Sequence, residues 1–516
     1  MRKTLKDTLL GRLLPIYEAA AASNDGHRCM IAPSPEIRSQ IKKELKRLKG
    51  LAADGIFSNL LTAKQQSRLG LNDGLVLPGK VFPLGTSVAA VRQHTVNRSL
   101  LRGAVRVIVV LVEFPDKKLS FDKQHYEDLF FSTGKVSTGS VKEYYKEVTD
   151  GLVDIEGEIA GPFKMPQKLT YYANGNSGMG DNEPNARDMA RDAALAADPT
   201  IDFSKYDNDH DGYVDAFVVI HAGRGAEETA AKSDIWSHKW VLPNEYAADG
   251  AKVYGYLTVP EDCKLGVCAH ELGHLLFGFP DLYDTDYSSE GIGNWCLMAA
   301  GSWGNGGDTP SHPCAWCKAQ QDWVTTVNQT SNQKGLDIEP VVDSRKIFRL
   351  WKDGGPGNEY FLLENRQQKK FDQFLPGSGL LVWHIDDNIG TNDNELHYKV
   401  ALVQADGKKD LEKGNNTGDG GDPWPGELRK TSFDATTTPN SLSYGGLDSG
   451  VKIAGIRTKN GVITADVTVT AGVVKPPPKK KKSTPAKKAA PKKAVPKKAV
   501  KKKAAPKKAP KKKGYK

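Results

Sequence analysis

Runs of hydrophobic residues along the chain predict an α+β protein. The continuous run AVRVIVVLVEF, from residue 104, predicts a buried strand, and the alternating segment LVDIEGEIAGPF predicts another. Helical spacing of apolar residues predicts helices in SVKEYYKEVTDG and over residues 185–197. A further strand, AFVVIHAG, precedes the part of the chain with the most specific chemical signals.

The pattern changes from about residue 338. Short β-like runs follow one another between Gly, Asn and Asp residues: KIFRLW, EYFLLENR, GLLVWHID and KVALVQA. A last pair, VKIAGIRT and GVITADVTV, flanks Lys459-Asn460-Gly461, and Asn-Gly is a strong hairpin signal. The C-terminal part is therefore predicted to be β-rich.

These patterns divide the chain into four parts. Residues 1–85 are rich in helix formers and lysine and are predicted to be a pro-segment or an accessory arm. Residues 86–337 contain the chemical motifs, and residues 338–472 form the β-rich extension. Residues 473–516 form a tail built on Ala-Pro-Lys-Lys, and its dense like charge and frequent proline predict disorder.

The net charge of +10 hides two parts of opposite sign. Residues 475–516 contain 20 lysines and no acidic residue, so the rest of the chain has 52 basic residues against 62 acidic ones. Weak electrostatic binding of nucleic acid or anionic surfaces is thus expected from the tail alone, with a steep salt dependence. A solubilising tail without a partner is the alternative. No apolar run is long enough to predict a membrane span.

The segment CAHELGHLLFGFPDLYD, residues 268–284, has a metal-binding pattern. His270 and His274 stand at i and i+4, so they share one helix face and can take two corners of a tetrahedral Zn²⁺ site. Glu271 lies next to the first ligand and can act as general base toward a metal-activated water, then as acid toward the leaving amine. The sequence therefore predicts a hydrolytic zinc site.

Such a site needs a third protein ligand. Asp281 is the preferred candidate, because a helix that ends at Gly278 can turn the chain back toward the metal. Three other carboxylates nearby remain alternatives: Asp284, Asp286 and Glu290.

At these residues the chain resembles the immune inhibitor A-type zinc metallopeptidases, which are relatives of the metzincins. The loop GIGNWCLMAAGSW resembles the family's Met-turn, which implies that Met298 lies beneath the metal as a hydrophobic floor. Gly278 and Asp281 come four and seven residues after His274, one residue later than in metzincins. Similar blocks, such as KYDNDHDGYVDAFVVIHAGRGAEE and GDGGDPWPG, extend the resemblance over residues 100–430.

The resemblance implies a metzincin-like catalytic domain over residues 86–337, with a mixed sheet and an active-site helix. It implies a zinc-dependent endopeptidase that acts on proteins or peptides, and we expect a monomer. In such folds the edge strand of the sheet binds the substrate backbone, and AFVVIHAG, which ends near His221, is the candidate strand. The resemblance suggests secretion, but Arg12 and Glu18 interrupt the N-terminal apolar stretch, so no clear signal peptide is expected and a cytoplasmic location stays open.

An acidic loop lies just before this strand. Hard oxygen ligands alternate around Gly212 in a pattern typical of a structural Ca²⁺ site, and the four candidates are Asp207, Asp209, Asp211 and Asp215. Val218 stands where an EF-hand has its glutamate, so the loop is not an EF-hand. A solvated acidic turn without calcium is the alternative.

The cysteines offer one further hypothesis. Cys29 lies in the predicted pro-segment, and a thiolate is a good zinc ligand, so it could hold a zymogen inactive. A buried thiol without such a role is the alternative, and it is favoured on the sequence alone. The other five cysteines fall between residues 263 and 317, which predicts one local disulfide or packed thiols.

Two other classes of function compete with the peptidase. One is a catalytically inactive metal-binding protein, against which the intact HELGH argues. The other is a protein that binds nucleic acid or anionic surfaces through its tail. A serine nucleophile or a nucleotide mechanism has no support, because the chain contains no GxSxG, P-loop or dinucleotide-binding glycine motif.

Overall fold

The computed structural model describes residues 28–52 and 99–470. The chain divides into two units, residues 1–471 and residues 472–516, and only the first contains described residues. The predictions for residues 1–27 and 53–98, which include the boundary near residue 85, and those for the lysine-rich tail 473–516 lie outside the described part.

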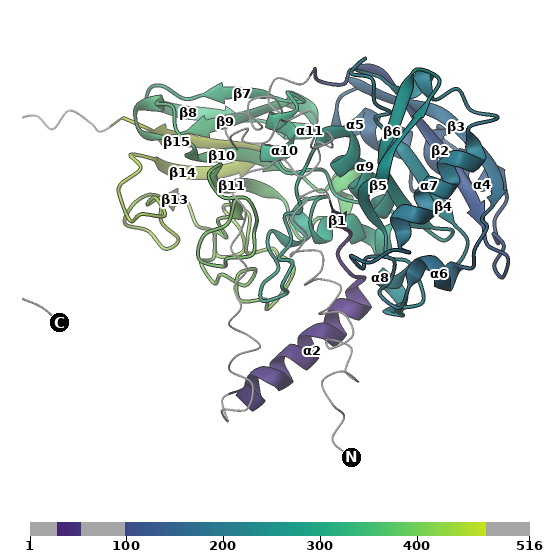
Figure 1. The fold of residues 1–516 in the computed structure, drawn as a ribbon. Helices are drawn as coiled ribbons and strands as arrows, with labels where there is room; N and C mark the ends of the chain where they lie inside the picture. The colour runs from purple at the N-terminus through teal and green to yellow at the C-terminus, as the bar shows by residue number, and fades with distance from the viewer. Residues whose placement is uncertain (1–27, 53–98, 471–516) are drawn as a thin grey trace, which may run out of the picture. The chain divides into compact units, whose positions relative to one another are not determined.

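A six-stranded mixed sheet forms the first half of the fold (Figure 1). Its strands, in spatial order, are β1 (Cys29–Met30), β5 (His238–Ala248), β6 (Ala251–Pro260), β4 (Phe217–His221), β2 (Gly103–Glu113) and β3 (Val153–Lys164). The four strands from β6 to β3 run parallel, whereas β5 and β1 are antiparallel additions at one edge. The edge of this sheet is therefore built from segments far apart in sequence.

The strand AFVVIHAG does not lie at that edge. It forms β4, which pairs with β2 on one side and β6 on the other, and all five of its residues are buried. The expectation that it provides the substrate-binding edge is wrong. A continuous apolar run is what a central parallel strand needs, because both of its faces are covered.

Helices cover both faces of the sheet. One face carries α4 (Lys123–Phe131), α5 (Val141–Val148) and α9 (Leu265–Phe277), and the other carries α6 (Leu169–Ala173) and α7 (Ala186–Ala197). The β2 residues alternate between the two cores: Val107 and Val109 pack with α9, and Ile108 and Val110 pack with α7. Figure 1 shows α9 beside β5 and β6, at the antiparallel edge.

The C-terminal half contains two further sheets. The five-stranded one has the order β12 (Val400–Leu402), β11 (Gly379–Asp386), β10 (Glu359–Arg366), β9 (Lys346–Leu350) and β7 (Thr325–Asn328). The four-stranded one has the order β13 (Ser432–Phe433), β14 (Lys452–Lys459), β15 (Val462–Thr468) and β8 (Gln333–Ile338). Residues from both sheets share one hydrophobic core, so they form a sandwich.

The predicted hairpin at the end of the described chain is confirmed. β14 and β15 pair antiparallel, and Asn460 and Gly461 between them have φ values of 51° and 81°. Two successive positive φ values are what a two-residue hairpin turn requires, and Asn-Gly meets that requirement with little strain. The predicted helices and the other predicted strands are also present, so the fold is the mixed α+β protein that was expected.

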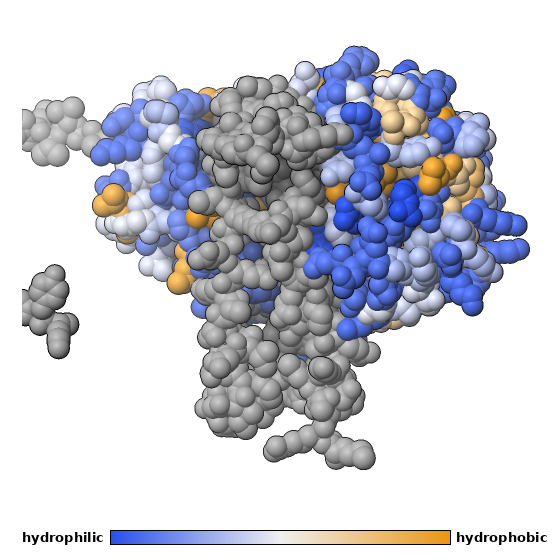
Figure 2. Space-filling model, viewed as in Figure 1, coloured by the Kyte–Doolittle hydropathy of each residue, from blue (hydrophilic) through white to orange (hydrophobic). Residues whose placement is uncertain are grey.

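The remaining elements are short, apart from one helix in the N-terminal segment. They are α2 (Pro35–Ala52), η3 (Phe203–Tyr206), α8 (Ala226–Thr229), η4 (Gly293–Trp295), η5 (Ala300–Gly307), α10 (Ala315–Gln320), α11 (Val341–Ser344), η6 (Lys352–Gly354) and η7 (Lys370–Phe374). Among the described residues, no helix combines the length and apolarity that crossing a bilayer requires. On the face shown in Figure 2, hydrophobic side chains lie in small groups among hydrophilic ones.

Candidate metal centre

The helix α9 carries the predicted motif and is buried along its whole length. It ends at Gly278, which has a φ of 67°, as the sequence predicted. The amides of Gly278 and Phe279 donate to the carbonyls of His274 and Gly273, at 3.0 and 3.2 Å. This left-handed turn reverses the chain, so the residues that follow can approach the helix again.

Three predicted ligands meet at one point. The Nε2 atoms of His270 and His274 lie 3.0 Å apart, and Oδ1 of Asp281 lies 3.1 and 3.2 Å from them. Donors about 2.0 Å from a tetrahedral zinc ion are about 3.3 Å from one another. The observed triangle therefore has the size that a zinc ion needs.

Backbone carbonyls orient both imidazoles. Nδ1 of His270 donates to the carbonyl of Leu297 at 3.0 Å, and Nδ1 of His274 donates to that of Phe279 at 2.5 Å. With the proton on Nδ1, each Nε2 keeps its lone pair and points it into the triangle. Because backbone carbonyls are provided by any residue type, the sequence contained no signal for these two positions.

The protonation states suit a cation. Burial lowers the pKa of His274, so the imidazole is neutral. Burial alone would raise the pKa of Asp281, but the two imidazoles outweigh it and hold this pKa at about 2. Metal ligands must be neutral imidazoles and ionised carboxylates, so His274 and Asp281 are already in the required forms.

Glu271 lies next to the triangle without a partner. Its side chain is fully buried, and neither carboxylate oxygen has a hydrogen-bond partner among the described residues. Burial, with the negative charge of Asp281, raises the pKa of Glu271 well above its ordinary range. A buried carboxylate without a partner is costly, so its position indicates a role toward a bound group.

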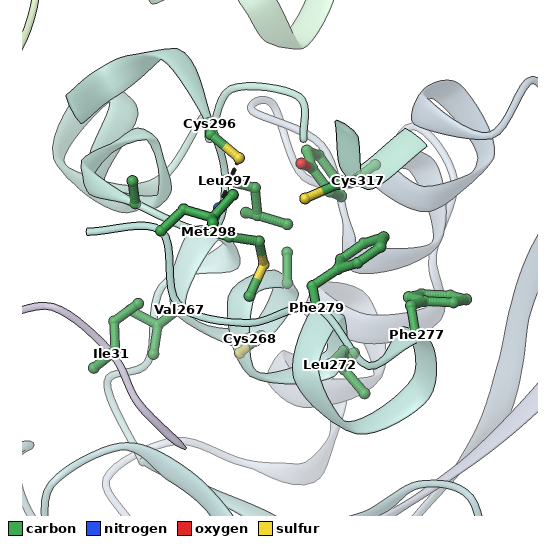
Figure 3. Close-up of a cluster of buried hydrophobic side chains, with 14 of the residues drawn as sticks. Ile31, Val267, Cys268, Leu272, Phe277, Phe279, Cys296, Leu297, Met298 and Cys317 are labelled. Atoms are coloured by element: carbon green, nitrogen blue, oxygen red, sulfur yellow. Dashed lines mark hydrogen bonds between the residues drawn. The ribbon is translucent and has the colours of Figure 1, made fainter. Parts of the chain in front are cut away.

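Met298 packs against the middle of α9. A methyl group added at Gly273 would lie 2.9 Å from its sulfur, so the helix and the side chain touch between the two histidines. Figure 3 shows Met298 in a cluster of buried hydrophobic side chains that includes Leu272 and Phe279. Met298 therefore lies against the helix that carries the two histidines, and its role as a floor beneath a metal stays a prediction.

The three alternative third ligands lie elsewhere. Asp284 accepts hydrogen bonds from the hydroxyls of Ser288 and Ser289, and from the amide of Asp286. Glu290 forms ion pairs with Arg38, at 2.9 Å, and with Lys42. Only Asp281 of the four carboxylates completes the triangle.

Only three of the four candidate carboxylates in the acidic loop lie close together. Carboxylate oxygens of Asp207, Asp209 and Asp215 lie within 4.8 Å of one another. The fourth candidate, Asp211, is not in this group, and its Oδ1 accepts the amide of Tyr213 at 2.9 Å. A structural calcium ion remains a prediction from the sequence.

None of the six cysteines forms a disulfide. The sulfurs of Cys296, which belongs to the predicted Met-turn loop, Cys314 and Cys317 lie within 4.8 Å of one another, which agrees with the prediction of packed thiols. The sequence could not show where Cys29 lies: its sulfur, a ring nitrogen of His274 and a carboxylate oxygen of Asp281 are all within 4.8 Å of one another.

Comparison with known proteins supports the resemblance seen in the sequence. Residues 100–329 match the family described as immune inhibitor A peptidase M6, catalytic domain. The Pre-pro-metalloprotease PrtV of Vibrio cholerae serotype O1 is 31% identical over 330 residues, which cover 53% of this chain and 36% of that protein. Immune inhibitor A of Bacillus thuringiensis subsp. alesti is 33% identical over 264 residues, which cover 40% of this chain and 38% of that protein. The chain thus matches little more than a third of the length of either relative.

Proposed function

We propose, from the match of residues 100–329 to the immune inhibitor A peptidase M6 family, that the chain is a zinc-dependent endopeptidase that hydrolyses proteins or peptides. His270, His274 and Asp281 hold the metal, and Glu271 is the general base. Met298 supports the centre without touching the substrate.

The observation that carries this proposal is the combination of the donor triangle with the isolated glutamate. Three donors 3.0 to 3.2 Å apart suit zinc, and a fully buried carboxylate without a partner stands beside them. A structural zinc site has no use for a neighbouring base, whereas a catalytic one needs a group that accepts the proton of the attacking water. The arrangement therefore favours hydrolysis over mere metal binding.

A zinc ion supplies Lewis acidity, which polarises the scissile carbonyl and makes a water molecule more acidic. Glu271 accepts the proton of the attacking water and passes it to the leaving amine. A buried carboxyl with a raised pKa suits both steps, since it can hold the proton between them. The dry surroundings of α9 strengthen these interactions, because its residues are buried.

The test compares metal content and hydrolysis of casein in matched variants. Glu271→Gln is expected to keep its zinc and to lose activity by at least about 10²-fold, because only proton transfer is removed. Asp281→Asn is expected to lose both zinc and activity. Asp286→Asn is the control, because Asp286 lies outside the triangle, and it should keep both.

Two outcomes would contradict the proposal. If the purified protein contains no stoichiometric metal, and a chelator leaves casein hydrolysis unchanged, then the chain is not a metallopeptidase. If Glu271→Gln retains the activity of the parent protein, then another residue is the base.

A further inference from the structure

The N-terminal segment is joined to the sheet beside α9. β1 pairs antiparallel with β5, with Cys29 opposite Lys239 and Met30 opposite His238. The amide of Ile31 continues the pairing by donating to the carbonyl of Ser237 at 3.2 Å. Without β1, β5 would be the edge strand of this sheet, and an edge strand can bind an extended peptide through its backbone.

Side chains of the body fix the backbone of this segment. Tyr283 donates to the carbonyl of Met30 at 2.8 Å, Trp236 to that of Ile31 at 2.9 Å, and Trp303 to that of Ala32 at 2.9 Å. The three segment residues themselves are buried in the same core as α9. Figure 3 shows Ile31 close to Val267 of that helix.

Ion pairs connect α2, the helix that follows this segment, to the body of the protein. Glu290 is fully buried, and Arg38 and Lys42 of α2 provide its counter-ions. A buried carboxylate without a counter-ion is strongly unfavourable, so the body depends on α2 for this contact. The segment is thus part of the folded structure, although it precedes the matched catalytic domain in sequence.

Cys29 is the residue of this segment that reaches the metal centre. Its side chain is 3% exposed, and its sulfur lies within 4.8 Å of donor atoms of both His274 and Asp281. Thiolate is among the strongest protein ligands of zinc. The pairing of β1 with β5 therefore brings a zinc-binding atom next to two of the three donors of the candidate zinc site.

We propose that the intact chain is latent, with Cys29 as a fourth zinc ligand and residues 28–32 on the strand edge where the substrate backbone binds. The inference rests on the zinc site proposed above. The Cys29 thiol gives up its proton to solvent on binding, and its sulfur takes the ligand position that the attacking water needs. Departure of the segment frees both the ligand position and the edge of β5.

The first test uses the full chain with Glu271→Gln, so that it cannot cleave itself, and with Co²⁺ in place of zinc. A sulfur ligand gives a near-ultraviolet charge-transfer band, which nitrogen and oxygen ligands do not give. The band is expected in Glu271→Gln, and it should be absent when Cys29→Ser is added. Cys263→Ser is the matched control, because Cys263 is a buried cysteine outside the three-donor centre, and it should keep the band.

The second test measures hydrolysis of a short fluorogenic peptide by the unprocessed chain. Cys29→Ser is expected to raise the rate by about tenfold or more, which corresponds to about 1.4 kcal/mol of lost inhibition. Arg38→Ala should raise it as well by loosening α2, and Cys263→Ser should leave it unchanged. N-terminal sequencing shows that each sample still contains residue 29.

The outcomes separate the two proposals. If cobalt does not bind at all, the zinc site itself is wrong. If cobalt binds but its spectrum is the same with and without Cys29, the site stands and the latency proposal is overturned. An unchanged peptidase rate in both Cys29→Ser and Arg38→Ala would also overturn the latency proposal.

Discussion

The orientation and the protonation of side chains in the candidate metal centre depend on the groups around them. His270 and His274 present Nε2 because two backbone carbonyls take their Nδ1 protons. Gly273 lies between them on the helix and leaves room for the sulfur of Met298. Burial then sets the charges, since it keeps His274 neutral and raises the pKa of Glu271. Burial also raises the pKa of a carboxyl that is not part of the donor triangle, that of Glu227.

Glu227 should make the stability of the protein depend on pH. Burial raises its pKa from 4.5 to about 7, although Ser237 donates to both of its oxygens. Between these values the folded state binds more protons than the unfolded state, so the free energy of unfolding falls as pH rises, by up to about 3 kcal/mol. Denaturant unfolding at pH 5 and pH 8 measures this fall.

Glu227→Gln is the comparison for this measurement. The amide carries no charge, so the unfolding free energy of the variant should fall less between the two pH values. Parallel pH profiles for the two proteins would show that Glu227 is not the group responsible.

Whole elements are joined by a buried group of charges. Arg366, at the end of β10, donates to both oxygens of Asp372, at 2.5 and 2.7 Å, and it lies 3.5 Å from Glu364. Glu364 also accepts from Lys318 of α10, at 2.7 Å. The same guanidinium lies 3.4 Å from the carbonyl of Trp295. This network connects the C-terminal sandwich to the loop that carries Met298.

Replacing Arg366 by Met should destabilise the protein by about 3–5 kcal/mol, because Asp372 would remain buried without its guanidinium partner, while Glu364 would keep only Lys318. Thermal or denaturant unfolding measures the loss. The control is Lys369→Ala, which breaks the exposed pair with Asp343 and should change stability by less than about 1 kcal/mol. Equal effects of the two substitutions would contradict this account of the network.

The molecule as a whole combines an acidic body with a cationic tail. The 20 lysines of residues 475–516 outweigh an excess of ten acidic residues in the rest of the chain. Average properties such as the pI of about 9.0 therefore describe neither part. The proposed catalytic residues all lie in the body, and binding of polyanions is expected only from the tail.

Removal of residues 471–516 should reverse the behaviour of the protein on ion-exchange columns. The full chain is expected to bind a cation exchanger or immobilised DNA at low salt, with a steep loss of binding as salt rises. The truncated protein should instead bind an anion exchanger at pH 7 and keep its peptidase activity. Retention of DNA binding after truncation would place the anion-binding surface in the body.

The sequence predicted what depends on local spacing. The i, i+4 histidines, the helix end at Gly278 and the Asn460-Gly461 hairpin are set by short-range geometry, and the structure contains all three. The position of β4 in the sheet was predicted wrongly, because strand order depends on which segments pair over long distances. For the same reason the sequence could propose Cys29 as a ligand, but it could not place it opposite Lys239.

If residues 28–32 inhibit the enzyme as proposed, the pairing of β1 with β5 also determines how that inhibition depends on the protein concentration. A segment that is covalently part of the chain competes with substrate at an effective concentration that the connection sets and that does not depend on the protein concentration. Dilution of the protein leaves this competition unchanged. Once the connection to the body is cut, the same peptide becomes an ordinary competitor that dilution removes. Activation would then be governed by a single cleavage event, and the liberated peptide that contains residues 28–32 would be a starting sequence for a separate inhibitor.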